Sequence, residues 1–246
     1  MNEILCRQLA LDYCCSVEDI ADSCNHFSVY SPLNGRRLYK NDDNVFLKIA
    51  VVGGKILFSG RPDIIDWCRE RYSKTGGEWF FEPGTIRDLE RRLHEDRYTV
   101  RMLHPFYIAD RISPVFTGNY DVRWYEGSEI EVFRGDKRWN EALSFSVTVP
   151  DVLAVTAERG DEILGMAGAS MDSPIMWQIG INIADGYSGM GIGTALVSLL
   201  KNEILSRGIL PFYGTSFSHL ASQRVALGSG FVPAWVEMST HPDVKL

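Results

Sequence analysis

The sequence lacks any run of apolar residues long enough to cross a membrane. A transmembrane helix needs about 20 consecutive apolar residues, and no stretch of this 246-residue chain approaches that length. The first residues also lack the basic segment and apolar core of a secretory signal peptide. We therefore expect a cytoplasmic protein without a membrane partner.

Cysteine is scarce and confined to the first third of the chain. The five cysteines stand at positions 6, 14, 15, 24 and 68. None forms a Cys-x-x-Cys pair, and no histidine lies at zinc-site spacing from them. An odd, clustered set of this kind is typical of reduced thiols in a cytosolic protein. The sequence therefore predicts neither a metal site nor a disulfide framework.

Positive charge is also in short supply. The chain has 25 lysines and arginines against 32 aspartates and glutamates, a formal net charge of −7. This balance argues against non-specific binding to nucleic acid. The rest of the composition, 45% hydrophobic and 23% charged, is that of an ordinary globular protein with one large or two small domains.

The most informative segment lies near the C-terminus. Its glycines alternate at Gly189, Gly191 and Gly193, between a strand-like run (Met176 to Ile183) and an apolar helical stripe. Glycine lets backbone amides approach an anion closely, and a helix N-terminus adds unpaired N–H donors and a partial positive charge. The segment therefore predicts a phosphate-binding loop, and a glycine-rich turn without a ligand is the alternative.

Two common nucleotide-binding spacings do not fit this loop. A Walker loop requires Lys after its last glycine, but Thr194 follows Gly193. A Rossmann fingerprint requires a glycine where Thr194 or Leu196 stands, depending on where the motif starts. Binding of a nucleotide therefore remains only the third and least favoured interpretation of this loop.

The loop resembles instead the acyl-CoA loop of the GNAT acetyltransferase superfamily, (Gln/Arg)-x-x-Gly-x-(Gly/Ala). Ser188 stands in the Gln/Arg place, and Gly191 and Gly193 take the two small places. Residues 219–231 are similar to a second GNAT signature, roughly Asn-x-Ala-Ser-x-Arg followed by Gly-Phe, with His219 in place of Asn. Two signatures in order are far more specific than either alone.

The resemblance covers about half of the chain and implies an α+β fold, in the α/β sense used for GNAT proteins. We expect a GNAT domain with a mixed, mostly antiparallel sheet over residues 119–246. A smaller α+β domain is expected over residues 1–118, an arrangement similar to that of some bacterial two-part GNAT proteins. That first domain is hypothesised to be a divergent GNAT-like fold.

Local patterns predict the individual elements. A Gly-Gly pair between two apolar runs is a strong hairpin signal, and Thr85 is placed to cap a helix. The predicted segments are a hairpin over 44–59, helices over 63–72, 86–97 and 192–205, and strands over 99–108, 121–133, 152–156, 163–170, 176–183 and 209–217.

The resemblance also implies how acetyl-CoA would be held, without a metal. Backbone groups near Ile181 and Ile183 would align the pantetheine arm and polarise the acyl carbonyl. The remaining cofactor contacts would come from Ser222 and from the loop with the first helical turn, namely Ser188, Gly189, Met190, Gly191, Ile192, Gly193 and Thr194.

The proton path departs from the family pattern. Gln178 stands where many GNAT enzymes have Glu, and Ala226 where many have a Tyr acid. Neither can transfer a proton, which leaves His219, Tyr213 and Asp185 as candidates near the site. His219 is the catalytic candidate, as an acid or base or as a CoA contact, and a helix-capping role is its alternative.

The predicted function is direct transfer of an acetyl group from acetyl-CoA to an amine of a small molecule or peptide. A non-catalytic acyl-CoA-binding or regulatory module is the alternative, because Gln178 and Ala226 replace the usual acid and base. Acceptor-binding residues are expected from the first helices of the GNAT domain, around Arg138 to Phe145. No nucleic-acid partner is expected, and a homodimer is left open.

Overall fold

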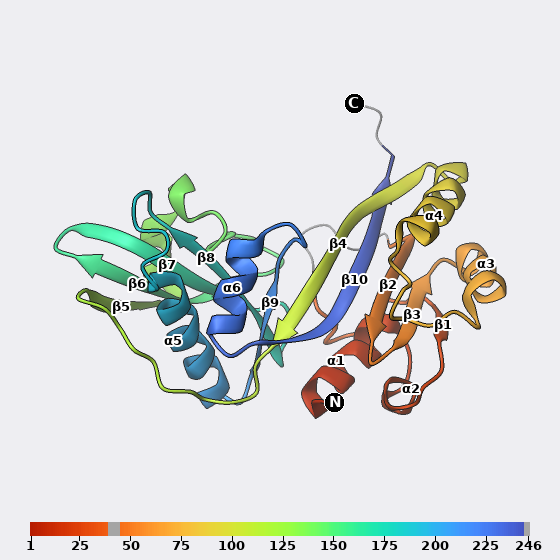
Figure 1. Ribbon diagram of the computed structural model, residues 1–246, viewed down its shortest axis with the longest axis horizontal. Coiled ribbons are helices and arrows are strands. Elements are labelled where there is room, and N and C mark those ends of the chain that lie inside the picture. The colour runs from red at the N-terminus through yellow and green to blue at the C-terminus, as the bar shows by residue number, and fades with distance from the viewer. Residues whose placement is uncertain (39–44, 244–246) are drawn as a thin grey trace. The chain divides into compact units, whose positions relative to one another are not determined.

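The computed structural model describes residues 1–38 and 45–243, and the chain divides into two compact units (Figure 1). The first unit comprises Met1–Arg36, Asn41–Phe106 and Ala234–Leu246, and the second comprises Arg37–Lys40 and Tyr107–Pro233. The second unit therefore holds both GNAT-like signatures. The domain boundary expected at residue 118 stays a prediction, because a compact unit is not by itself an independently folding domain.

In the described residues, the first unit combines four helices with one group of strands. Its helices are α1 (Glu3–Tyr13), α2 (Val17–Ala21), α3 (Pro62–Tyr72) and α4 (Pro83–Glu95). Its strands are β1 (His26–Val29), β2 (Leu47–Val52), β3 (Lys55–Gly60) and most of β4 (Tyr98–Ile108) and β10 (Val232–Pro242). The strands lie in the order β1-β3-β2-β10-β4. β1 and β3 are parallel, while β2 is antiparallel to both β3 and β10.

The predicted hairpin is confirmed in this unit. β2 and β3 pair from Leu47 opposite Gly60 to Val52 opposite Lys55. The two turn residues, Gly53 and Gly54, have φ of 58° and 82°, values that a tight hairpin turn demands and that glycine adopts without strain. Residue 44, where the prediction began, lies outside the described residues.

The start of α4 corrects the capping prediction. Glu82 is the N-cap residue and Pro83 is the first helical residue, a position where the missing N–H of proline costs nothing. The helix therefore begins before Thr85, which lies inside the first turn instead of capping it.

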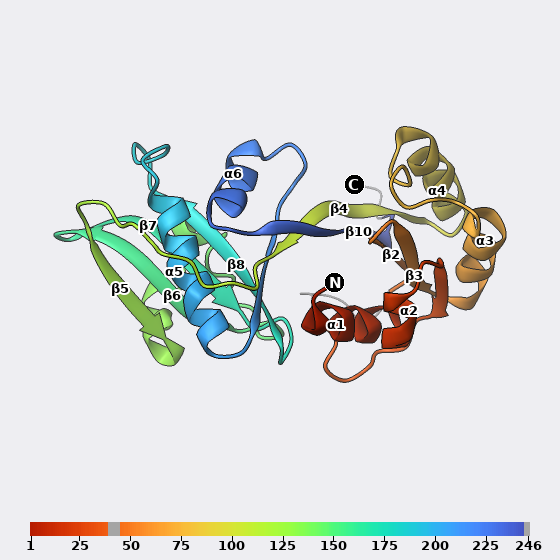
Figure 2. The ribbon, with the colours of Figure 1, turned by 60° about the horizontal axis from the view of Figure 1, so that its bottom comes forward.

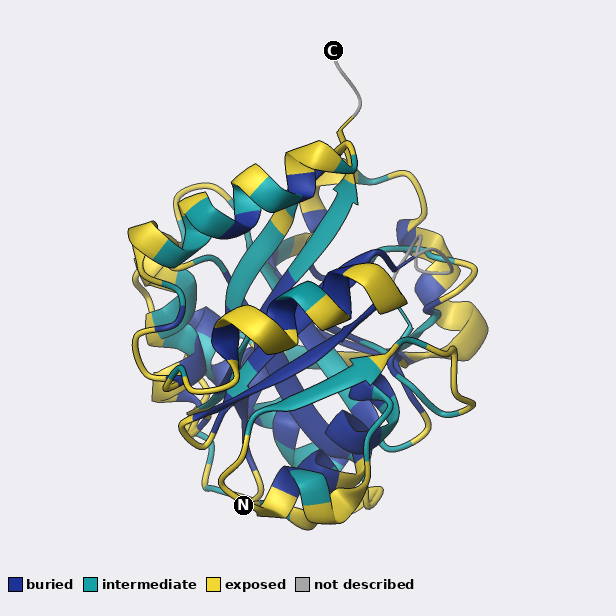
Figure 3. Ribbon diagram, turned by 90° about the vertical axis from the view of Figure 1, so that its right-hand side faces the viewer, coloured by how far each residue is buried: buried dark blue, intermediate teal, exposed yellow. Residues whose placement is uncertain are grey.

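Buried and exposed residues alternate along the helices in Figure 3, as expected for helices that pack one face on a core.

The second unit contains the remaining strands and two α-helices. Its strands β5 (Asp121–Glu126), β6 (Asp151–Arg159), β7 (Glu162–Ser170), β8 (Met176–Ile183) and β9 (Leu210–Gly214) lie in the order β9-β8-β7-β6-β5. All neighbouring pairs are antiparallel except β8 and β9, which are parallel. The α+β class and the mixed, mostly antiparallel sheet are confirmed.

Helix α5 (Ile192–Ser206) lies across the strands of this unit, and α6 (Leu220–Gly228) follows β9 (Figure 2). The apolar stripe of α5 buries Ile192, Leu196, Leu200 and Ile204 in one core with side chains from β6, β7 and β8. Each such side chain stabilises the fold by about 1.5–3 kcal/mol relative to exposure. This packing fixes the position of the first turn of α5.

Two predicted strands are shorter in the structure. β5 ends at Glu126, and Gly127, with φ of 57°, starts a 3-10 helix, η1 (Gly127–Phe133). β9 ends at Gly214, several residues before the predicted end. The strands predicted over 99–108, 163–170 and 176–183 agree with β4, β7 and β8 to within one residue.

The helices expected around Arg138 to Phe145 are absent. These residues, all of them described, contain only the end of a short 3-10 helix, η2 (Lys137–Trp139). The N–H groups of four residues are bound by side chains of β6 and β8, namely those of Glu141, Ala142, Ser144 and Phe145. The N–H of Leu143 donates to the carbonyl of Trp139, which makes one isolated turn and no helix. Phe145, with φ of 48°, is in the left-handed region and would end a right-handed helix.

No helix within residues 1–38 and 45–243 is both long and apolar enough to traverse a bilayer. All five cysteines lie in the part of the chain that the structure describes, and all five are free thiols.

Candidate active site

The predicted phosphate loop connects β8 to α5. Gly186, Gly189 and Gly191 have φ of 85°, 80° and 79°, a left-handed conformation that favours glycine. No atom lies within 4 Å of the position that a Cβ would take on any of the three. The loop backbone is therefore shaped by glycine and is open to close approach by a ligand.

The first turn of α5 presents unpaired donors at the end of this loop. The N–H of Ala195 makes the first helical hydrogen bond, 3.0 Å long, to the carbonyl of Gly191. The N–H groups of Ile192, Gly193 and Thr194 consequently have no partner within the helix. Gly191 is the N-cap residue and has no side chain to cap them, and no acidic residue stands in the first turn. An anion at this point would meet free donors and the positive end of the helix dipole.

The cofactor residues predicted in this loop differ in what they can offer a ligand. Ser188 and Met190 are exposed, whereas the side chain of Ile192 is buried in the core. Gly193 is buried too, and a Cβ there would lie 3.5 Å from Val225 and 3.6 Å from Ile183. Ile192 and Gly193 can therefore contribute only backbone groups.

The pairing of β8 and β9 stops partway along β8. Their parallel register runs from Met176 opposite Leu210 to Gln178 opposite Phe212 and goes no further. On its other edge β8 remains paired with β7 as far as Ile183. The backbone around Ile181 and Ile183 is therefore free of a strand on the β9 side, and their side chains pack on the core. An extended ligand can pair with such a free strand edge.

Helix α6 carries two of the predicted residues. His219 is its N-cap residue, is exposed, and makes no side-chain cap hydrogen bond. Ser222, one turn on, places its Oγ 2.9 Å from the Oη of Tyr213 on β9. The structure thus brings Ser222 together with Tyr213, while the imidazole of His219 stays outside that pair.

Glu141 lies within the Arg138 to Phe145 segment that was expected to bind the acceptor, but the sequence did not single it out. Its carbonyl oxygen lies 1.8 Å from where a Cβ on Gly180 would stand, and the carbonyl of Ala142 lies 2.1 Å from the same point on Gly168. Gly168 and Gly180 are opposite each other in β7 and β8. The two glycines therefore form a slot that seats the 141–142 backbone directly on the sheet.

The side chain of Asn182 holds this segment in the slot. Its Oδ1 accepts the backbone N–H of Glu141 at 2.9 Å and that of Ala142 at 2.8 Å. Glycine inside a strand often marks close approach by another backbone. Gly168 and Gly180 thus signal that a backbone approaches the sheet closely, but they do not tell which segment it is.

The pKa of Tyr213 lies above its ordinary value. Burial raises the pKa of Tyr213, the hydrogen bond with Ser222 lowers it, and the charge of Glu141 raises it. The phenol is 2% exposed, whereas Glu141 is exposed. A buried phenol that keeps its proton and an accessible carboxylate are the two partners that general acid–base chemistry needs.

The residues at the usual acid and base positions do not serve that purpose. Ala226 is buried in the core. Gln178 is half-buried, and its backbone N–H donates to the carboxylate of Asp172. Asp185 is exposed in the turn after β8.

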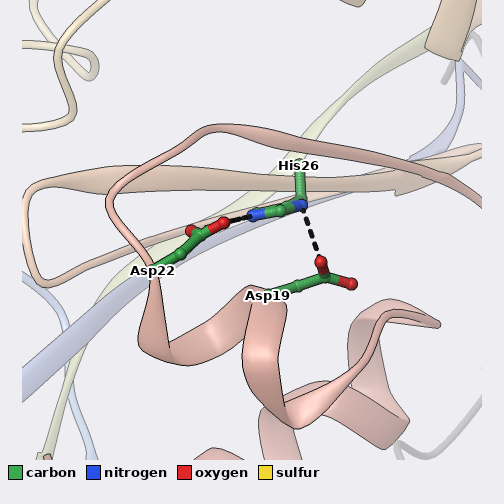
Figure 4. A group of neighbouring side chains, drawn as sticks. All are labelled: Asp19, Asp22 and His26. Carbon is green, nitrogen blue, oxygen red and sulfur yellow. Dashed lines mark hydrogen bonds and ion pairs between the residues drawn. The ribbon is translucent and has the colours of Figure 1, made fainter.

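One group of side chains in the first unit has the geometry of metal ligands. Ligand atoms of Asp19, Asp22 and His26 lie within 4.8 Å of one another, with the His26 ring between the two carboxylates (Figure 4). The ammonium of Lys55 already binds Asp22 at 3.0 Å and also donates to the carbonyl of Asp19. A divalent cation would have to displace this positive charge, so the group is better described as an ion-paired cluster.

The family described as acetyltransferase (GNAT) matches residues 112–231. No curated protein matches the sequence. Similar solved structures include a GCN5-related N-acetyltransferase-like protein from Streptococcus suis, with 12% identity, a TM-score of 0.49, and coverage of 84% of this chain and 89% of that chain.

Two further structures are an acetyltransferase from the GNAT family from Colwellia psychrerythraea and a GCN5-related N-acetyltransferase from Kribbella flavida. The first has 13% identity, a TM-score of 0.45, and coverage of 92% of this chain and 97% of that chain. The second has 15% identity, a TM-score of 0.46, and coverage of 66% and 65%. The chain thus spans less than two thirds of the length of the Kribbella protein. Residues 112–231 thus match the GNAT acetyltransferase family, and acyl transfer is the general chemistry that this match supports.

Proposed function

We propose that the protein transfers an acetyl group from acetyl-CoA to an amine of a small molecule or peptide, by direct attack of the amine on the thioester. The observation that carries this proposal is the loop before α5. Its three left-handed glycines are open to approach, and they lead into uncapped N–H groups without a neighbouring acid. A pyrophosphate is the part of CoA that such donors bind best.

The free edge of β8 supports the rest of the donor site. The peptide-like pantetheine arm can pair with backbone groups near Ile181 and Ile183, on the side where β9 has ended. The thioester would then lie between the loop and the 141–142 segment. Ser222 contributes through its contact with Tyr213.

Glu141 and Tyr213 provide a proton path for the reaction. The amine nitrogen forms a bond to the thioester carbon, and the carbon–sulfur bond breaks. Glu141 accepts the proton that the amine loses, and Tyr213 donates a proton to the departing CoA thiolate. The products are an amide and free CoA. His219, exposed at the start of α6, is the second candidate for the acid.

A non-catalytic acyl-CoA-binding module is the second candidate function. Gln178 and Ala226, at the usual base and acid positions, favour it. The two candidates predict the same binding but opposite results in a turnover assay.

Binding is tested by the melting temperature of the protein with millimolar acetyl-CoA. We expect a rise for the wild-type protein and none for Gly191→Asp, because the new carboxylate repels the pyrophosphate. Gly160→Asp is the matched control, since Gly160 also has a positive φ, of 60°, in open space but lies in the turn between β6 and β7. A wild-type protein that does not respond to acetyl-CoA or CoA contradicts the proposal.

Turnover is tested by CoA release with a panel of amines. Release that depends on an added amine supports the transferase, whereas binding without release supports the module. The net charge of −7 favours a neutral or basic acceptor over nucleic acid. The free thiols are consistent with a cytoplasmic location, and a homodimer is tested by the mass in solution.

A further inference from the structure

In the first unit, α3, α4 and the segment between them line an open pocket. Its volume is about 510 Å³, within the range of roughly 300–1,000 Å³ that small-molecule sites occupy. It is lined by Arg71, Tyr72, Thr75, Gly84, Thr85, Arg87, Asp88 and Arg91.

The lining concentrates positive charge in a chain that is acidic as a whole. Three guanidinium groups stand against one carboxylate, so the formal charge of the lining is 3 − 1 = +2. The whole chain has a formal charge of −7. A local excess of arginine against that background marks a site suited to an anion.

Asp88 arranges two of the arginines. Arg71 donates to both carboxylate oxygens, from Nε at 2.7 Å and from Nη2 at 3.1 Å, and Arg91 lies 3.5 Å from Oδ1. The hydroxyl of Tyr72 also donates to Asp88, at 2.8 Å. Each guanidinium has five N–H donors, so both arginines keep donors for a ligand after binding Asp88.

Arg87 and the first turn of α4 supply further donors. Within the described part of the chain, the side chain of Arg87 has no hydrogen bond or ion pair. Thr85 lies inside the helix instead of capping it, so its hydroxyl is available. No atom lies within 4 Å of where a Cβ on Gly84 would stand, which leaves the backbone there open to a ligand.

We propose that this pocket binds the phosphoryl group of a small phosphorylated molecule. A phosphomonoester carries a charge close to −2 near neutral pH, which balances the +2 of the lining. The planar forks of arginine match phosphate oxygens in geometry, and a hydroxyl and backbone N–H groups can bind the remaining oxygens. The site is independent of the acetyl-CoA site proposed above.

The test uses the full chain, labelled with ¹⁵N and titrated with inorganic phosphate at constant ionic strength. We expect saturable shifts of the Gly84 and Thr85 amides. In the double variant Arg87→Ala and Arg91→Ala the dissociation constant should rise at least about tenfold, because two charged donors are lost. Arg7→Ala, which removes an exposed arginine of α1, should bind as the wild-type protein does.

Two comparisons make the outcome decisive. The Gly191→Asp variant should show the same phosphate-induced shifts of the Gly84 and Thr85 amides as the wild-type protein. This result distinguishes phosphate binding in the pocket from binding at the acyl-CoA loop, even if the loop does not bind acetyl-CoA. Equal melting temperatures would show that the double variant is folded. Shifts that do not saturate, equal affinity in the double variant and Arg7→Ala, or equally tight binding of acetate would each overturn the proposal.

Discussion

The carbonyl oxygen of Glu141 occupies the space that a side chain on Gly180 would need, 1.8 Å from the position of a Cβ. On the glycine opposite, Gly168, the carbonyl oxygen of Ala142 likewise lies where a side chain would stand. The sheet therefore determines where Glu141 lies, and a loop residue acquires the fixed position that acid–base chemistry requires.

Gly180→Ala should be strongly destabilising. The methyl group would overlap a backbone carbonyl that Asn182 holds in place, and we expect a loss of about 3 kcal/mol in the free energy of unfolding. The measurement is urea unfolding without ligand. Gly193→Ala is the control, since its Cβ would make only ordinary contacts at 3.5 Å, and a change within about 1 kcal/mol is expected. Equal stability of Gly180→Ala and the wild-type protein would contradict the seating of residues 141–142.

Tyr213→Phe should lower the turnover number by roughly 100-fold or more, because the CoA thiolate loses its proton donor. The affinity for acetyl-CoA should change little, since only the hydroxyl beside Ser222 is removed. The measurement compares kcat with the dissociation constant of acetyl-CoA. Ser222→Ala, which keeps the phenol, should retain most of the activity. Unchanged turnover in Tyr213→Phe would favour His219 as the acid.

Glu141→Gln should remove the proton acceptor and leave the segment in place, because the backbone N–H, not the carboxylate, binds Asn182. We expect a loss of roughly 100-fold in kcat with the melting temperature unchanged. Glu129→Gln, an exposed carboxylate in η1, serves as the control. A fall in kcat in both variants would show that the loss of a negative charge, and not the loss of a specific proton acceptor, lowers the activity.

If Tyr213 is the general acid, as proposed, its raised pKa, due first to burial, sets the alkaline limit of activity. A general acid acts only while protonated, so its activity is lost as pH rises through the folded-state pKa. Because that pKa lies above the ordinary value of 10.0, a rate profile should show no loss from this group below about pH 10. A tyrosine-dependent loss near neutral pH, absent in Tyr213→Phe, would contradict this assignment.

The cluster around His26 predicts a sensitivity to acid. The hydrogen bond with His26 is the main cause that lowers the pKa of Asp22, and the backbone N–H of Ser16 is the main cause for Asp19. A carboxylate whose pKa is lower in the folded protein than in the unfolded chain, where it is near 3.8, stabilises the fold at pH values above 3.8. This stability is lost as the pH falls through the folded-state pKa values. Melting temperatures measured from about pH 5 downward should therefore fall less steeply for Asp22→Asn than for the wild-type protein. Parallel curves would show that the cluster does not contribute.

The sequence predicted those parts of the site that depend on neighbours along the chain. The helix that begins at Ile192 and the strand that ends at Ile183 are local patterns, and both are confirmed. The phosphate-binding role of the glycine loop between them stays a prediction. The prediction that Thr85 caps a helix was wrong, because the helix already starts at Pro83. Both residues give local signals for a helix start, and that of the proline prevails.

Glu141 could not be found in the same way, because its place depends on contacts between distant segments. Gly168 and Gly180 must first pair across two strands, and only then can the 141–142 backbone lie over them. Neither glycine is remarkable when its own neighbours alone are considered. Tyr213 and Ser222 meet for a similar reason, since a strand and the following helix must pack before their hydroxyls can bond.

Strand β10 has a consequence for synthesis of the chain on the ribosome. β2 is antiparallel both to β3 and to β10. Most of β10, from Ala234 to Pro242, is translated after every residue of the second unit. The first unit to emerge is thus the last to be completed. Until its final strand arrives, the edge of β2 is unpaired, and nascent chains at this stage are expected to need protection from aggregation.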